Sequence, residues 1–144
     1  MAIADDSKRK RRLLMHLREE VYCRVAASDI HGVGVFAIRA IAKGVNPFRG
    51  SGPSREIRVS RHELRSLPHR VRGLIDMYCV AEKGTFLIPE LGLNRMDIAF
   101  YVNHSAKPNI SYVRKGVMKT TRAIKAGEEL TLNYDATFGE THDF

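Results

Sequence analysis

The sequence predicts a β-rich α+β domain with many short strands. Its 144 residues are enough for one domain with a single modest core. A content of 44% hydrophobic and 28% charged residues is typical of a globular protein. From residue 21 onward, short β-like runs alternate with turns that contain glycine, whereas helical patterns are brief. The loops between so many short strands are expected to carry the function.

The first 20 residues form a separate basic segment. Residues 1–7 show no regular pattern and are expected to be disordered, and Lys8–Arg12 is an unbroken run of cations. This run fits a nuclear-localisation or nucleic-acid patch, or the exposed start of a helix that reaches about Glu20. The apolar residues after it are too few for a signal peptide, and no stretch approaches the roughly 18 residues of a membrane span.

The net charge of +8 is unevenly distributed along the chain. Residues 1–72 hold 16 Lys/Arg against 7 Asp/Glu, whereas residues 73–144 hold 8 against 9. This asymmetry fits weak nucleic-acid contact through the basic N-terminal half, or a solvated basic face. The aromatic residues that interleave with cations in a single-strand-binding groove are missing, which favours the solvated face.

Cys23 and Cys79 are the only cysteines in the chain. They could pair, but two isolated thiols in an intracellular protein are more often reduced and buried. Neither has a second cysteine at ligand spacing, so no metal site is expected from them.

Runs of β-branched and aromatic residues between turn signals predict the strands. These are 21–27, 35–41, 78–81, 85–88, 110–114, 117–122 and 129–134. The capping box Ser60-Arg61-His62-Glu63 predicts a helix that ends near Pro68. A second helical segment covers 70–77, and Asn94 can cap a short helix through Val102.

Three segments contain residues suited to ligand binding or catalysis. In the first, His31-Gly32-Val33-Gly34, two glycines let the backbone approach a ligand closely and offer amide donors. A tight turn is the commoner role of such a pair. The longer dinucleotide-binding fingerprint is not met, because Phe36 and Ala37 stand where its third glycine should be.

The other two segments lie in the second half of the chain. Asn103-His104-Ser105-Ala106-Lys107-Pro108-Asn109 gathers amides, an imidazole and a hydroxyl in one loop. It makes a poor metal site or nucleophile site, and a capped turn closed by Pro108 is the structural alternative. The last segment, 124–135, is a turn that feeds a strand ending on Tyr134 and Asp135. The alternative there is an ordinary half-buried tyrosine on a surface hairpin.

In this order and at these separations, the three segments resemble the motifs of the SET-domain lysine methyltransferases. The family pattern is Gly-x-Gly before a strand, then Asn-His-Ser-x-x-Pro-Asn, then Gly-Glu-Glu-Leu-Thr-x-x-Tyr. The likeness covers residues 21–136. The chain is similar to small stand-alone members of the family from bacteria and large viruses. It implies several small, curved sheets around a pseudoknot, in which the C-terminal segment threads beneath the loop carrying Asn103 and His104.

The resemblance also implies S-adenosylmethionine as the methyl donor. The acceptor would be a lysine of a protein substrate, such as a histone or another basic DNA-binding protein. The backbone around His31, Gly32 and Val33 would receive the methionine part of the donor. Asn103 and His104 would hold its amino end and its adenine.

The remaining site residues follow from the same resemblance. Tyr134 would be the catalytic tyrosine beside the transferred methyl group, and Phe138 would cover the adenine. Phe48, Tyr78 and Leu132 would line the substrate channel. A phenol with a pKa of about 10 is mostly protonated near neutral pH, so Tyr134 is not expected to act as the general base.

The chain departs from the family pattern at several positions. Ala106 stands where many members have cysteine, and no cysteine follows Cys79, so the zinc-bearing flank is missing. The expected division is therefore a basic tail with a short helix at 1–20, the SET domain at 21–136, and a tail at 137–144 that completes the pocket. Phe48 and Leu132 replace a frequent tyrosine and a frequent aromatic residue, which leaves the number of added methyl groups open.

The alternative function is a non-catalytic SET-fold module that binds a basic peptide or nucleic acid. Retention of Asn103, His104 and Tyr134 favours the enzyme. Neither a metal cofactor nor a membrane partner is expected, and the sequence does not indicate an oligomeric state. The expected location is intracellular, which means cytoplasmic in a bacterium and nuclear in a eukaryote or for a virus.

Overall fold

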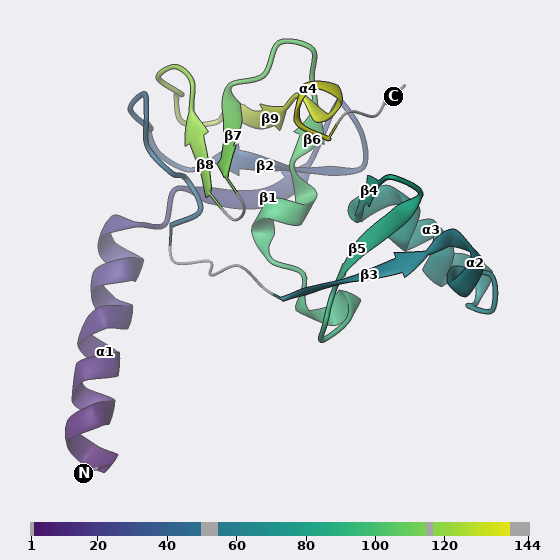
Figure 1. Ribbon diagram of the computed structural model, residues 1–144. Coiled ribbons are helices and arrows are strands. Elements are labelled where there is room, and N and C mark those ends of the chain that lie inside the picture. The colour runs from purple at the N-terminus through teal and green to yellow at the C-terminus, as the bar shows by residue number, and fades with distance from the viewer. Residues whose placement is uncertain (1, 50–54, 115–116, 139–144) are drawn as a thin grey trace.

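The structure, a computed structural model, describes residues 2–49, 55–114 and 117–138. Small sheets and short helices form its body (Figure 1), which confirms the predicted α+β class. The helices are α1 (Ala2–Glu19), α2 (Arg61–Leu64), α3 (His69–Tyr78), α4 (Tyr134–Phe138) and the 3₁₀ turns η1 (Leu93–Arg95) and η2 (Ile98–Tyr101). The strands are β1 (Cys23–Ala27), β2 (Val33–Ala37), β3 (Glu56–Ser60), β4 (Val80–Glu82), β5 (Thr85–Pro89), β6 (Asn103–His104), β7 (Ile110–Arg114), β8 (Val117–Thr120) and β9 (Glu129–Leu132).

The central sheet has the strand order β1-β2-β9-β6. β1 and β2 form an antiparallel pair in which Cys23 lies opposite Ala37. β9 pairs antiparallel with β2, where Val35 lies opposite Leu130, and parallel with β6. The last strand of the chain is therefore held between two earlier segments, as the expected pseudoknot requires.

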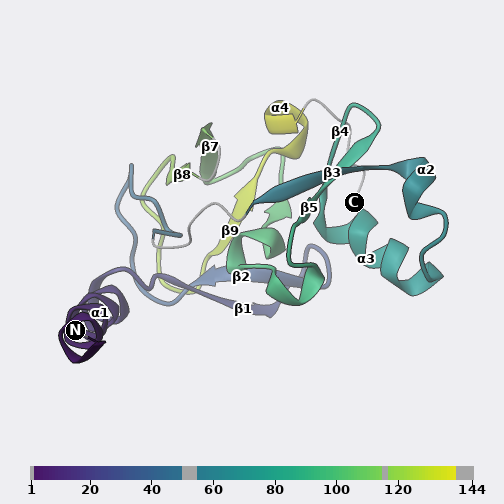
Figure 2. The same cartoon turned by 60° about the horizontal axis from the view of Figure 1, so that its bottom comes forward.

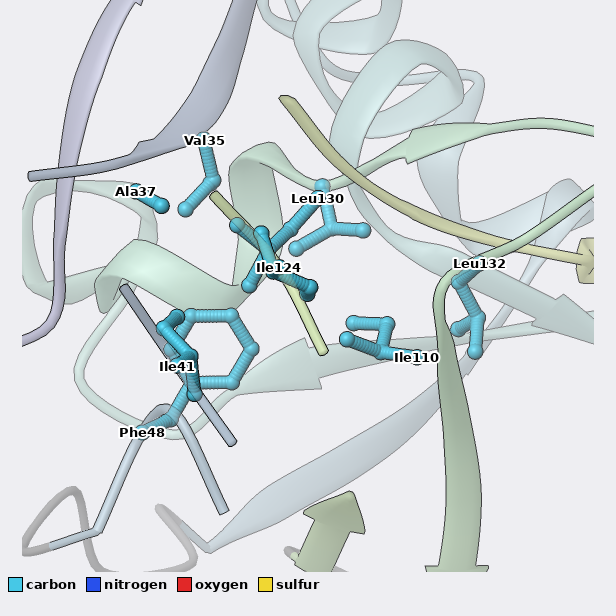
Figure 3. Close-up of a cluster of buried hydrophobic side chains, with 9 residues drawn as sticks. Val35, Ala37, Ile41, Phe48, Ile110, Ile124, Leu130 and Leu132 are labelled. Atoms are coloured by element: carbon cyan, nitrogen blue, oxygen red, sulfur yellow. The ribbon is translucent and has the colours of Figure 1, made fainter. Parts of the chain in front are cut away.

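The main hydrophobic core packs against this sheet. Val35 and Leu130, from neighbouring strands, are fully buried. Ile41 and Ile124 form a β-bridge with two backbone hydrogen bonds of 2.8 Å. Figure 3 shows the ring of Phe48 beside Ile41. The full cluster is Val35, Ala37, Ile41, Phe48, Val102, Ile110, Ile124, Leu130 and Leu132.

A second, smaller cluster lies under the sheet β3-β5-β4. Leu64 of α2 and Ile75 of α3 pack there with Cys79 and Phe86. Figures 1 and 2 show α2 and α3 together at one end of the molecule, with α1 at the opposite end. The helices of this unit therefore lie on the far side of the body from the N-terminal basic run.

The two cysteines belong to different clusters and are both free thiols, so they do not pair. Cys79 is buried as expected, whereas Cys23 is only partly buried. Burial raises the pKa of Cys23 to about 12. Burial, with a smaller contribution from Glu56, raises the pKa of Cys79 to about 11. Both thiols therefore stay protonated and unreactive near neutral pH.

Several predicted elements are confirmed, and others are corrected. The capping box forms, with Ser60 Oγ accepting from Glu63 N at 3.2 Å, but α2 ends at Leu64, well before Pro68. The helix expected from Asn94 is instead two 3₁₀ turns. The cap of the second turn is Asp97, which accepts from Ala99 N at 2.9 Å. β3 was not predicted, because its side chains give no buried face.

The N-terminal prediction was wrong for residues 2–7, which belong to α1. An ion pair of 2.8 Å between Arg9 and Asp5, one helical turn apart, supports the helix there. Leu13, Leu14 and Leu17 remain about half exposed, and α1 extends away from the body (Figure 1). In the part of the chain that the structure describes, no helix is long and apolar enough to cross a membrane.

Candidate active site

β6 brings the Asn-His dipeptide against the C-terminal motif. Its two residues pair in parallel with β9, Asn103 opposite Thr131 and His104 opposite Leu132. Asn109 fixes the other end of the loop. Its Oδ1 accepts from Thr131 N at 2.8 Å, and its Nδ2 donates to Glu129 O at 2.7 Å. The side chain thus replaces a missing strand partner for β9.

The glycine loop is a tight turn between β1 and β2. Ser28 N donates to Gly32 O at 2.9 Å, and Ser28 Oγ accepts from Ile30 N at 3.0 Å. Gly32 has a φ of 46°, in the left-handed region where glycine carries no steric cost. The turn therefore needs the first glycine for its backbone conformation.

The second glycine, Gly34, makes room for two other side chains. A Cβ built on Gly34 would collide with the Glu129 carboxylate and would lie 3.0 Å from Asn103 Nδ2. The sequence suggested that a ligand approaches the backbone closely here. At Gly34, the groups that do so are polar side chains of the protein itself. Any larger residue would push Glu129 or Asn103 out of place.

The Asn103 amide joins these groups into one network. Its Nδ2 lies 2.9 Å from Val33 O, 3.2 Å from His31 O and 2.9 Å from Glu129 Oε1. Ser28 Oγ donates to both carboxylate oxygens of Glu129, at 2.8 and 2.9 Å. These carbonyl and carboxylate oxygens can only accept, so they fix which end of the amide faces them. Asn103 Oδ1 then points away and has no hydrogen bond to any other described residue.

His104 connects the same dipeptide to Tyr134. Its Nδ1 accepts from Tyr134 N at 3.0 Å, and the two rings meet edge to face with centroids 5.6 Å apart. Since Nδ1 accepts, the proton of the neutral ring lies on Nε2, which is 3.8 Å from Asp135 Oδ2. The imidazole thereby holds the start of α4 against β6.

Tyr134 was expected at the end of the last strand, but it is the first residue of α4. Asn133 caps this helix, because its Oδ1 accepts from Ala136 N at 3.0 Å. The Tyr134 hydroxyl donates to Val102 O. Burial raises the pKa of Tyr134 to about 12, so the phenol stays neutral at physiological pH. A neutral phenol fits an orienting group and not a general base.

The other predicted channel residues are Tyr78, Leu132 and Phe48. The ring of Tyr78, at the end of α3, meets the ring of Tyr101 edge to face at 5.2 Å. Tyr101 directly precedes Val102, the acceptor for the Tyr134 hydroxyl. Leu132 is buried in the main core, against which Tyr134 packs. Phe48 is also a core residue, 7% exposed, so the structure gives it a packing role and its place in a channel stays a prediction.

The side chain of Phe138 and residues 139–144 lie outside what the structure describes, so the adenine lid stays a prediction. Sequence reasoning missed Ser28 and Glu129, although Glu129 stands inside the third motif. It also missed Tyr101 and the carbonyl of Val102. The available signal for Ser28 was its position, as a polar residue between a strand and the glycine pair. Nothing local connects it to Glu129, which lies 101 residues later.

Comparison with known proteins agrees with this geometry. The family model of the SET domain matches residues 32–135, which is more than half of the chain. The chain therefore belongs to the SET-domain family, whose members are typically protein-lysine methyltransferases.

A solved structure shows the same fold. The crystal structure of a Plasmodium falciparum protein, described as a candidate histone methyltransferase, matches with a TM-score of 0.52 and 19% sequence identity. The match covers 83% of this chain and 98% of that chain. At this identity the likeness is one of fold alone. No curated protein matches this chain.

Proposed function

We propose that this SET domain transfers methyl groups from S-adenosylmethionine to a lysine side chain of a protein. One observation supports the proposal above the others: the Asn-His dipeptide is hydrogen-bonded to both of the other motifs. Asn103 donates to carbonyl oxygens of the glycine loop, and His104 accepts from the amide of Tyr134. The proposed donor-binding loop and the proposed catalytic tyrosine lie far apart in the sequence, and both are hydrogen-bonded to this dipeptide.

The network around Asn103 fits the positively charged end of the donor. Asn103 Oδ1 can accept from an ammonium group, and the nearby carboxylate of Glu129 favours a cation. The backbone of His31 to Val33 is held in place by the same amide. When bound, S-adenosylmethionine supplies a methyl group that is activated by a sulfonium sulfur.

Tyr134 would orient the amine that accepts the methyl group. A hydroxyl has one donor and two acceptor positions. The Tyr134 hydroxyl donates to Val102 O, and its oxygen would accept from an N–H of the amine. The lysine must be neutral to react, which costs roughly 4 kcal/mol at neutral pH for a pKa of about 10.4. An apolar channel around Tyr78, Tyr101 and Leu132 would lower that cost by disfavouring the ammonium.

The substrate that we propose is a histone or another basic DNA-binding protein. Support comes from the description of the Plasmodium protein with the same fold as a candidate histone methyltransferase. The solvent-exposed part of Asp135, beside His104, adds a negative charge near the proposed channel. Such a charge favours lysines that lie in basic sequences.

Calorimetry with S-adenosylmethionine tests the donor site first. We expect the wild-type protein to bind it, and Asn103→Ala to weaken binding at least tenfold, about 1.4 kcal/mol, through loss of the acceptor. Asn94→Ala, at an exposed position in η1, is the matched control and should bind normally.

Transfer of a labelled methyl group to histones and to basic DNA-binding proteins then tests the reaction. Binding of the donor without transfer to any such protein would contradict the proposed acceptor. Absence of donor binding by the folded wild-type chain would instead favour a non-catalytic SET module. Melting temperatures of all variants separate these outcomes from a folding defect.

A further inference from the structure

A pocket of about 360 Å³ lies between α2, α3 and β5, outside the site described above. Leu64 and Phe86 contribute to its apolar surface, and most of the other lining residues are charged or titratable. Its charged and titratable residues are Arg61, Arg65, His69, Arg72 and Asp76. None of these residues takes part in the Asn103–Tyr134 network. The pocket therefore calls for a separate explanation.

The described residues neutralise the positive charge of this pocket only in part. Three arginines against Asp76 leave a net charge of +2 on the lining. On the adjoining sheet, Arg55 and Arg58 do pair, with Glu90 at 3.9 Å and Glu82 at 3.5 Å. The described residues supply no such ion pair to the arginines of the pocket.

The carboxylate of α2, Glu63, is already used. Glu63 accepts from Ser60 N at 2.9 Å and from Ser60 Oγ at 3.0 Å in the capping box. These hydrogen bonds lower the pKa of Glu63 and hold its charge at the start of α2. Glu63 is also not part of the pocket lining.

Two further features point to an anionic ligand. Arg72 Nε is buried and has no hydrogen-bond partner among the described residues, which is a costly state for a guanidinium. In addition, α3 begins at the pocket with His69, without a side-chain cap or an acidic residue in its first turn. An anion in the pocket would complement both the guanidinium and the positive end of the helix.

The Arg61 side chain is also held in position. Its guanidinium carbon lies 4.9 Å from the centroid of the Phe86 ring, at the apolar side of the pocket. A stacked guanidinium loses less freedom when it binds, and its edge remains available for bidentate contacts with phosphate. The cluster is thus partly preorganised.

We propose that this pocket, lined by Arg61, Arg65 and Arg72, binds the phosphate backbone of duplex DNA. Its volume falls at the lower end of the range for ligand sites, which is enough for a phosphodiester group with part of its sugar. The sequence pI of about 9.8 and the clustering of arginines on one face fit nucleic acid better than an isolated acidic peptide. With no exposed aromatic ring in the lining, binding would be independent of base sequence.

Fluorescence anisotropy with a labelled DNA duplex, at several salt concentrations and without S-adenosylmethionine, tests the proposal. For Arg61→Gln/Arg65→Gln/Arg72→Gln we expect at least tenfold weaker binding at low salt. The slope of log affinity against log salt should fall by about 2 to 3, since each lost phosphate contact removes about 0.9. Arg65→Gln alone, at an exposed position, should lower the slope by about 1 without affecting the fold.

The matched control is Arg9→Gln/Arg11→Gln/Arg12→Gln, which removes the same charge from α1 at the opposite end of the molecule. It should keep most of the affinity and of the salt slope. Equal or larger losses in the control would assign the contact to α1 and overturn the proposal. Failure of the wild-type chain to bind the duplex, or equally tight binding of a poly-glutamate peptide, would also overturn it. Because donor and lysine substrate are absent, this result is independent of the proposed methyl transfer.

Discussion

Gly34 shows how a small residue can organise a site without touching a ligand. The space next to its Cα is occupied by the Glu129 carboxylate and the Asn103 amide. That carboxylate is in turn held by Ser28. Glu129 and Asn103 therefore occupy the space of the missing side chain, and Ser28 holds Glu129 there.

Gly34→Ala tests this arrangement. The new methyl group has to displace Glu129 or Asn103, so the free energy of unfolding should fall by about 1–3 kcal/mol, and affinity for S-adenosylmethionine should fall with it. Gly73→Ala is the control, because nothing lies within 4 Å of its added Cβ in α3, and it should be neutral or slightly stabilising. Urea denaturation and calorimetry on both variants measure the effects. Equal behaviour of the two variants would contradict the packing account.

Individual residues of the site were predictable only where the motif itself names them. Asn103, His104 and Tyr134 were predicted. In the structure His104 accepts from Tyr134 N, and the adjacent Asn103 donates to the glycine loop. Ser28 and Glu129 were not, because their roles arise from a contact across 101 residues. A glutamate inside a strand motif carries no local sign that it will face a serine near the N-terminus.

Among the elements, β9 depends on side chains as much as on strand pairing. Its neighbour β6 has only two residues, and the pairing is continued by Asn109, whose amide bonds to Thr131 N and Glu129 O. Asn109 is 3% exposed, so water cannot replace these hydrogen bonds. The side-chain hydrogen bonds between β9 and the loop that ends at Asn109 therefore depend on this one buried residue.

Asn109→Ala should consequently destabilise the protein by about 2–3 kcal/mol, since it leaves buried backbone groups of β9 without partners. Asn94→Ala, on the surface of η1, should change the free energy of unfolding by less than about 0.5 kcal/mol. Denaturant unfolding of both variants gives the comparison. A loss below 1 kcal/mol for Asn109→Ala would show that β9 is held by other contacts.

The elements that were predicted correctly have clear local signals. The capping box at Ser60 and the turn between β4 and β5 were found from neighbouring residues alone. β3 was missed because it is stabilised by pairing with β5 and presents exposed side chains such as Ile57. α4 was missed although Asn133, a favourable cap, was visible before Tyr134.

For the molecule as a whole, α1 lies apart from the folded body. Leu13, Leu14 and Met15 are 54%, 47% and 46% exposed, and the helix extends away from the sheets (Figures 1 and 2). Near its end, Arg39 donates to the carbonyl of Glu19, and His16 bonds to Glu20 at 3.0 Å. The His16–Glu20 contact stays within the end of the helix, so of these two contacts only that of Arg39 ties the last turn of α1 to the body.

Removal of residues 1–15 should lower the helical circular dichroism signal and leave the midpoint of unfolding almost unchanged. The reason is that the side chains of residues 5–15 are exposed and bury little apolar surface against the body. Full-length protein measured side by side is the reference. A clear drop in the midpoint of the shortened chain would show that α1 packs against the body or against a second copy in solution.

We propose that the neutral, partly buried Tyr134 orients the amine during methyl transfer, and Tyr134→Phe tests this role. The change removes one oxygen, so the variant should fold and bind S-adenosylmethionine. The rate of methyl transfer should fall by at least 100-fold, about 2.7 kcal/mol of barrier, which is the usual cost of losing one preorganised polar contact. A tyrosine with a purely structural role would instead cost under about 1.5 kcal/mol of stability and leave the rate unchanged. Turnover of the variant within a few fold of the wild type, on a substrate that the wild type methylates, would contradict the account.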